Sequence, residues 1–189
     1  MYVALDIETT STDPDNGQVL EVAAVIDDRS KPVMDCPYFR QVVRQTQIVG
    51  QPRALYMNAR LLEIIANGGG VREQDLNHQL FTWLAKNLGM PGFDYWIARP
   101  NSTPVITFVG KNVGSFDKLF LKKLPGWPNR MVNYRSLDIG SLYASHERIP
   151  SLKDLLPLVN EKLAGEPHEA LYDARAALAL ARAMWGLDY

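Results

Sequence analysis

Two carboxylates, Asp6 and Glu8, interrupt the otherwise apolar stretch "VALDIETT". Side chains at positions i and i+2 of a strand point to the same face, so these two acids are expected to project side by side. Asp117 lies in "GKNVGSFDKLFL", and Asp173 lies in "PHEALYDARAA", five residues after His168. If the first and the later strands are neighbours and the last helix packs across them, the four carboxylates converge at one edge of the sheet.

A carboxylate cluster of this kind suits divalent cations. Bare anions would repel one another and lose solvation on burial. All-oxygen ligands favour hard ions such as Mg²⁺ or Mn²⁺. Two such ions ~3.5–4 Å apart can activate a water, hold a phosphate and stabilise the leaving oxygen. The imidazole of His168 suits it to take the proton from that water near neutral pH.

Each of these residues also has an ordinary interpretation when it is considered alone. A lone D-x-E on a strand is more often a solvated edge or an ion-pair site. Asp117 could be a helix N-terminal charge favoured by the macrodipole, and His168 could be a capping or surface residue, as expected for His78 and His146. The combination of spacing, order and local context favours a shared site.

The strands that carry these residues are indicated by Val- and Ile-rich stretches. "MYVALDIETT" and "QVLEVAAVIDD" are expected to be strands joined by the turn "DPDNG", and residues 37–49 could supply a third. "PVITFVG" predicts a buried strand followed by the short helix "SFDKLFLKKL", and "MVNYRSLDIGSLY" predicts a short strand and the start of a helix. This order predicts an α/β fold with a mixed central sheet flanked by helices.

Helices are predicted from apolar spacing at residues 52–70, 72–89, 151–163 and 168–185. The segment from Gly89 to Pro104 is rich in Pro and Gly and is expected to be a loop. Its aromatic residues could stack on unpaired bases or simply pack the loop. These are Phe93, Tyr95 and Trp96.

The composition fits one globular domain, residues 1–189, with 47% hydrophobic and 22% charged residues. No basic leader and no apolar run of ~20 residues is present, so we expect a soluble, cytoplasmic protein without a membrane partner. Cys36 is the only cysteine, which excludes an intramolecular disulfide and a cysteine-based zinc cluster.

The charge is unevenly distributed along the chain. The net charge of −1 argues against a protein that coats nucleic acid by bulk electrostatics. Residues 36–62 and 118–135 nevertheless carry only basic charges, while acids concentrate in the first 35 residues. This segregation suits a site where acids hold cations and basic flanks receive a polyanion, although ordinary solvated faces would give the same pattern.

Three motifs together resemble those of the DEDDh 3′→5′ exonucleases: "DIETT", "NVGSFDKLFL" and "HEALYDA". Between the second and third, "RSLDIGSLY" and "SLKDLL" are similar to the family's intervening segment and Leu-rich helix. The resemblance spans almost the whole chain. It implies a ribonuclease H-like fold and the release of nucleoside 5′-monophosphates from the free 3′ end of single-stranded DNA or RNA.

The resemblance also implies roles for individual residues. Asp6, Glu8 and Asp173 would hold the metal that carries the nucleophilic water, and Asp6 would bridge to a second Mg²⁺ or Mn²⁺ held by Asp117. His168 would be the general base. The residues implied near the terminal nucleotide are Thr9, Thr10, Asn112 and Phe116.

The motifs depart from the usual family pattern at three places. Lys111-Asn112 stands where His-Asn is common, with one extra residue before Asp117, a spacing similar to oligoribonuclease. His168 stands where oligoribonuclease typically has tyrosine, and Ser11-Thr12 replaces a frequent Gly-Leu pair. An oligoribonuclease-like enzyme on short RNA is therefore one alternative. Another is a proofreading or binding subunit, as a homodimer or with a polymerase-type partner.

Overall fold

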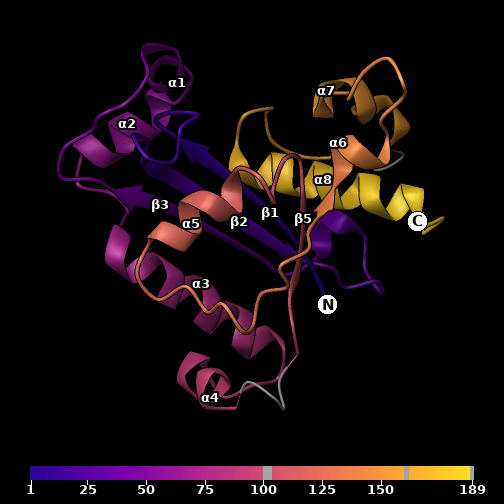
Figure 1. Cartoon of the computed structure of the whole chain (residues 1–189), viewed down its shortest axis with the longest axis horizontal. Coiled ribbons are helices and arrows are strands. Elements are labelled where there is room, and N and C mark those ends of the chain that lie inside the picture. Colours follow the sequence, from indigo (N-terminus) through magenta and orange to yellow (C-terminus); the bar gives the residue numbers. More distant parts are fainter. Residues whose placement is uncertain (100–103, 160–161, 188–189) are drawn as a thin grey trace.

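The computed structural model describes residues 1–99, 104–159 and 162–187. Its strands form one mixed sheet in the order β4-β3-β2-β1-β5-β6 (Figure 1). The strands are β1 (Tyr2–Thr9), β2 (Val19–Ile26), β3 (Tyr38–Arg44), β4 (Val71–Arg72), β5 (Thr107–Gly110) and β6 (Leu137–Asp138). β1, β2 and β3 form the expected antiparallel meander, and β5 joins the other side of β1 in parallel. The predicted α/β class with a mixed, helix-flanked sheet is confirmed.

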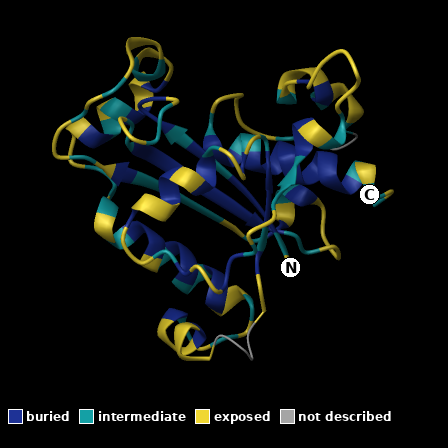
Figure 2. Ribbon diagram, in the orientation of Figure 1, coloured by how far each residue is buried: buried dark blue, intermediate teal, exposed yellow. Residues whose placement is uncertain are grey.

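Two long helices cover the sheet, α3 (Glu73–Asn87) and α8 (Ala170–Met184). They lie on opposite sides of the strands in Figure 1, and their inward surfaces are buried in Figure 2. Alternation along β1 decides what each face receives. Leu5 and Ile7 enter the core under α3, while Ala4 packs under α8. Because the side-chain period of a strand is two, the even-numbered Asp6 and Glu8 also face the α8 side.

The remaining helices are short. They are α1 (Pro52–Met57), α2 (Ala59–Ala66), α4 (Phe93–Ala98), α5 (Asp117–Lys123), α6 (Ile139–Leu142) and α7 (Leu152–Leu155), with 3₁₀ turns η1 (Val33–Asp35) and η2 (Leu156–Leu158). Within the described ranges, no helix is long and apolar enough to cross a bilayer.

Two predicted helices are shorter than expected. The helix expected over residues 52–70 is divided at Asn58, whose buried side-chain amide donates to the carbonyls of Thr9 and Ala54, both at 3.2 Å. Asparagine that bonds to nearby backbone competes with the helical ladder, which explains the break. The helix expected over 151–163 ends as an α-helix at Leu155, because Pro157 cannot continue the α-helical hydrogen bonding. Residues 160 and 161 of that prediction lie outside the described ranges.

The predicted loop from Gly89 to Pro104 was wrong over its central part, where α4 forms. Phe93 and Trp96 are buried in the core under α3, so burial of these two rings offsets the cost of ordering the segment. Tyr95 is exposed, with the Arg99 guanidinium 4.1 Å from its ring centroid. Residues 100–103 of the prediction lie outside the described ranges.

Candidate active site

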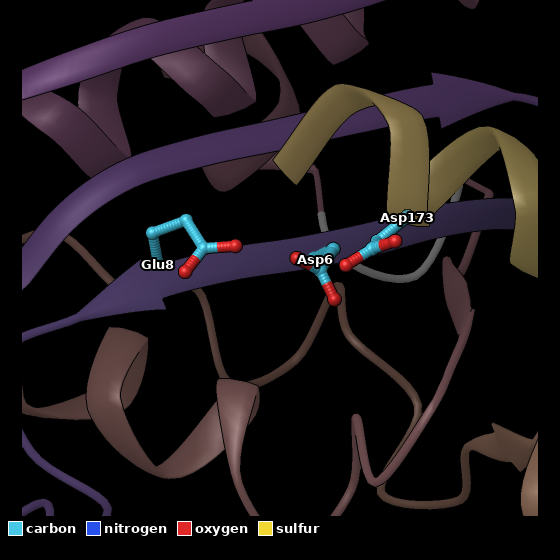
Figure 3. Close-up of side chains that lie close together, drawn as sticks. All are labelled: Asp6, Glu8 and Asp173. Carbon is cyan, nitrogen blue, oxygen red and sulfur yellow. The ribbon is translucent and has the colours of Figure 1, made fainter. Parts of the chain in front are cut away.

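Three carboxylates meet on the α8 face of the sheet. Asp6 and Glu8 project from β1, and Asp173 reaches them from the first turns of α8 (Figure 3). One ligand oxygen from each lies within 4.8 Å of the others. Alanines make this approach possible, because Ala170 and Ala174 of α8 are buried in the same cluster as Ala4 of β1 and bring the helix close to the strand.

Asp117 joins the site from the edge of the sheet. It is the first residue of α5, is 2% exposed, and its Oδ1 accepts a hydrogen bond from the backbone N–H of Ile7 at 3.0 Å. This N–H is available because β5 pairs with β1 only from Tyr2 to Ala4. The chain leaves β5 at Gly110, where an added Cβ would lie 2.6 Å from the Leu5 carbonyl oxygen. The short β5 therefore opens the strand edge that Asp117 occupies.

The carboxylates raise one another's pKa. Burial first, then the charges of Asp117 and Asp173, raise the pKa of Asp6 well above its usual range. Burial and Asp173 raise the pKa of Glu8 to about 8, opposed by a hydrogen bond from the Asn58 amide. Burial raises the pKa of Asp117 to about 7, and burial raises that of Asp173 while nearby His168 lowers it. Four acids in one place are thus unfavourable as bare anions.

This donor set fits the expected cations. Every ligand in the cluster is a carboxylate oxygen, the donor that Mg²⁺ and Mn²⁺ prefer. A bound cation would remove both causes of the raised pKa values, because it supplies a positive charge where burial and repulsion penalise negative ones. Asp6, Glu8 and Asp173 can hold an ion, and Asp117 lines the same pocket.

His168 lies at the same pocket, in the turn before α8. Its backbone N–H donates to Oδ2 of Asp173 at 3.3 Å, and its side chain is exposed. The backbone has φ of +67°, in the left-handed region that costs a non-glycine residue ~1–2 kcal/mol. The turn therefore holds an imidazole at the mouth of the pocket beside a metal-ligand candidate, which is compatible with its predicted role as general base.

The four predicted substrate residues separate into two pairs. Asn112 and Phe116 line the pocket, whose volume is about 480 Å³. Thr9 and Thr10 do not line it, and both are buried. The Thr9 hydroxyl donates to the Ser11 carbonyl at 2.7 Å, and the Thr10 hydroxyl accepts from a backbone N–H at 2.9 Å. These hydroxyls stabilise the turn after β1, so any contact of Thr9 or Thr10 with a nucleotide would have to be made by atoms other than the hydroxyls.

Several pocket and supporting residues were not predicted. Tyr172 and Ser151 line the pocket together with two lysines described below. Glu21 is paired with Glu8 across β1 and β2, is 1% exposed, and accepts from the Arg40 guanidinium at 2.7 Å and from the Ala170 N–H at 3.3 Å. A lone acid inside the apolar stretch "VLEVAAVI" was the available signal, but its partners depend on strand register.

An ion-pair chain fixes the turn that carries His168. Glu169 lies 3.0 Å from the Arg60 guanidinium and 3.8 Å from that of Arg40, which also binds Glu21. These contacts join the start of α8 to β2, β3 and α2. They tie Glu169, which directly follows His168, to the neighbouring strands and helix.

Comparison of the sequence with known protein families and with curated proteins finds no match. The fold, however, matches solved structures. E. coli exonuclease I in complex with a dT13 oligonucleotide superposes with a TM-score of 0.64 at 18% identity, covering 96% of this chain and 40% of that one. Its zinc-bound form with single-stranded DNA gives a TM-score of 0.65 at 18% identity, covering 98% and 40%.

A third match covers nearly all of both chains. The nuclease domain of 3′hExo, a DEDDh family member bound to rAMP, superposes with a TM-score of 0.64 at 16% identity, covering 98% of this chain and 91% of that domain. This chain spans about two fifths of the length of exonuclease I. The chain therefore shares its fold with exonuclease I and the 3′hExo nuclease domain, and its Asp6, Glu8, Asp117, His168 and Asp173 lie around one pocket.

Proposed function

We propose that this protein is a metal-dependent 3′→5′ exonuclease that releases nucleoside 5′-monophosphates from single-stranded DNA or RNA. The observation that carries the proposal is the convergence of Asp6, Glu8 and Asp173 within 4.8 Å, with Asp117 and His168 at the same pocket. The solved structures of similar fold add support, since their titles describe complexes with DNA oligonucleotides or with rAMP.

The residues divide the chemistry as follows. Two Mg²⁺ or Mn²⁺ ions, when bound, would supply the activated water and the positive charge that stabilises the phosphate and its leaving oxygen. Asp6, Glu8, Asp117 and Asp173 would hold them. His168 would accept the proton of the attacking water, whose oxygen bonds to phosphorus as the bond from phosphorus to the 3′ oxygen breaks. The leaving 3′ oxygen takes up a proton, and the terminal nucleotide departs as its 5′-monophosphate.

The pocket also supports a single-stranded substrate. Its volume of about 480 Å³ is of the size that holds one small ligand, such as a terminal nucleotide. Phe116, which lines the pocket and packs on Phe120 at a centroid distance of 5.0 Å, provides an aromatic edge for an unpaired base.

The test is degradation of 5′-labelled single strands. With Mg²⁺ or Mn²⁺ we expect a ladder that shortens from the 3′ end, and with EDTA no cleavage. DNA, RNA and dinucleotides compared in parallel would distinguish a general exonuclease from an oligoribonuclease-like enzyme. Asp6→Ala should be inactive, whereas Asp94→Ala, an exposed acid on the remote α4, should cut like the wild type. Cleavage that persists in chelator would overturn the proposal.

A further inference from the structure

Two lysines line the pocket that holds the acidic cluster, Lys111 in the loop after β5 and Lys153 on α7. Neither forms an ion pair with a carboxylate of the described residues. Other lysines differ. Lys31 and Lys123 pair with aspartates, and the Lys118 ammonium donates to two carbonyls and a hydroxyl. The pocket thus contains two cations that form no ion pair with any residue that the structure describes.

The Lys111 side chain lies in a slot against the α-carbon of Gly140. A Cβ built on Gly140 of α6 would clash with the Lys111 ammonium, and would lie 3.1 Å from its Cδ and 2.9 Å from Cγ2 of Ile149. The lysine therefore lies across the α-carbon of Gly140, beside Ile149. Gly140 does not have a positive φ, so its backbone does not require glycine. The absence of a side chain there serves to make room for Lys111.

The loop that carries Lys111 is tied to the same helix. Asn112 has φ of +59°, and its backbone N–H donates a short hydrogen bond to the carboxylate of Asp138. Asp138 is the N-cap of α6, and its other oxygen accepts from the Ser141 N–H at 2.7 Å. One carboxylate therefore fixes both the loop and the helix that forms the slot, which sets the direction of the lysine.

Lys153 is also presented by a fixed element. Ser151 and Asp154 form a capping box at the start of α7, with hydrogen bonds of 3.3 Å and 2.9 Å. The Asp154 carboxylate is engaged by Ser151 and lies 3.7 Å from the Arg148 guanidinium. Asp154 is thus held mainly by Ser151 and Arg148, and Lys153 adds the weakest of the attractions that lower the pKa of Asp154, without an ion pair.

We propose that Lys111 and Lys153 bind the phosphodiester oxygens of the nucleic-acid strand, and that Gly140 positions Lys111 for this contact. The inference rests on the proposed exonuclease function, because it assigns an anion to the same pocket. A polyanion approaching four carboxylates needs cations on the pocket wall, and lysine serves as a point charge for phosphate. Contacts of this kind fix the register of the strand without reading its bases.

The experiment measures oligonucleotide binding by fluorescence anisotropy in the Asp173→Asn background with Mg²⁺, and KM in the otherwise wild-type enzyme. Lys111→Met and Lys153→Met should each weaken binding by about tenfold, as for a hydrogen bond to a charged group. Each should also reduce the slope of log affinity against log salt by about 0.7. The matched control is Lys86→Met, an exposed lysine on α3. Variants that bind like this control would overturn the assignment.

Gly140→Ala tests the slot without removing a charge. It should reproduce the loss seen in Lys111→Met, and the two changes together should cost no more than either alone, because they remove one contact. Wild-type binding by Gly140→Ala would show that the slot does not position Lys111.

Oligonucleotides with one neutral methylphosphonate linkage identify the phosphate. Placed at the contacted linkage, the neutral group should abolish the difference between Lys111→Met and its parent. If a neutral group at none of the last few linkages before the 3′ end abolishes this difference, the proposed contact between Lys111 and a phosphate is wrong. If the wild type cleaves the strand but the lysine variants bind it as the wild type does, only this inference is overturned. Lysine-dependent binding by a wild type that does not cleave would overturn only the proposed function.

Discussion

The two faces of the sheet carry side chains of different size and polarity. Under α3, large side chains such as Phe81, Phe108 and Trp96 are fully buried. Phe81 contacts the Trp127 ring edge-to-face with centroids 5.5 Å apart. Under α8, the cluster is rich in alanine and valine, and charged groups are buried beside it, including Glu21. The α3 face supplies apolar burial, while the small side chains of the α8 face bring the helix near enough to β1 for carboxylates to meet.

The largest expected effect comes from replacing one carboxylate oxygen of Asp173, on the α8 face of the sheet, with an amide nitrogen. Asp173→Asn keeps the shape of the side chain but removes a ligand charge from the cluster. The rate should fall by at least about 10³-fold, at the upper end for loss of one electrostatic stabiliser. Thermal unfolding of the metal-free variant should occur at the same or a higher temperature, because a repelled buried carboxylate is gone. Near-normal kcat would remove Asp173 from the metal site.

Replacing His168 tests the role of the imidazole that lines the same pocket. His168→Ala should lower kcat by about 10²-fold, within the general-base range. Since alanine is strained at φ of +67°, His168→Gly serves as the control that keeps the backbone relaxed. Equal losses in both variants support a chemical role. A rate restored by glycine would show that backbone geometry caused the loss.

A pair of core substitutions separates the two faces. Leu80→Ala, on the core-facing side of α3, should cost ~2–5 kcal/mol of unfolding free energy with kcat/KM nearly unchanged below the melting temperature. Ala174→Leu, on the sheet-facing side of α8, should cost ~1–3 kcal/mol by overpacking, but should also reduce activity by displacing Asp173. Denaturant titration and kinetics on both variants provide the measurement. Equal activity loss in the two variants would contradict the assignment of apolar burial to the α3 face and of the carboxylate cluster to the α8 face.

The smallest expected effect is a pH dependence confined to the metal-free protein. Glu8 and Asp117 have pKa values raised to about 8 and about 7, so between pH ~4.5 and 8 the folded state binds more protons than the unfolded state. Stability should therefore fall as pH rises through this window. A decrease in Tm of at least about 2–4 °C is expected, the shift per kcal/mol for a chain of this size.

Added Mg²⁺ or Mn²⁺ should reverse this decrease, because a ligand that binds only the folded state stabilises it. Asp6→Asn should flatten the metal-free curve and abolish the response to metal. Calorimetric scans across the pH range provide the readout. A metal-free Tm that rises from pH 5 to 8 would show that the acids are not crowded as described.

The elements that sequence could predict are those decided by local rules. Alternation along β1 placed Asp6 and Glu8 on one face without knowledge of any partner. The approach of Asp117 and Asp173 was anticipated from the order of strands and from the three motifs. Composition alone could not have placed either, since each is separated from Asp6 by more than a hundred residues.

The parts that sequence could not predict depend on long-range contacts. Asn58 divides a helix because its amide finds the Thr9 carbonyl, 49 residues away. Phe93 and Trp96 form a helix in a Pro- and Gly-rich segment because a core is available to receive them. The pairing of Arg40 with Glu21 follows from the register of β2 and β3, which no local pattern specifies.

The hydrogen bond between Asp117 and the Ile7 N–H spans 110 residues and has a consequence for how the protein is made. During synthesis β1 emerges first, but its two acids have no completed metal site until α5 docks on the strand edge and residue 173 has been translated and folded. A nascent or nicked chain therefore presents carboxylates that hold a cation poorly. Under the proposed function, hydrolytic capacity would therefore arise only after residue 173 has been made and α8 has docked on β1.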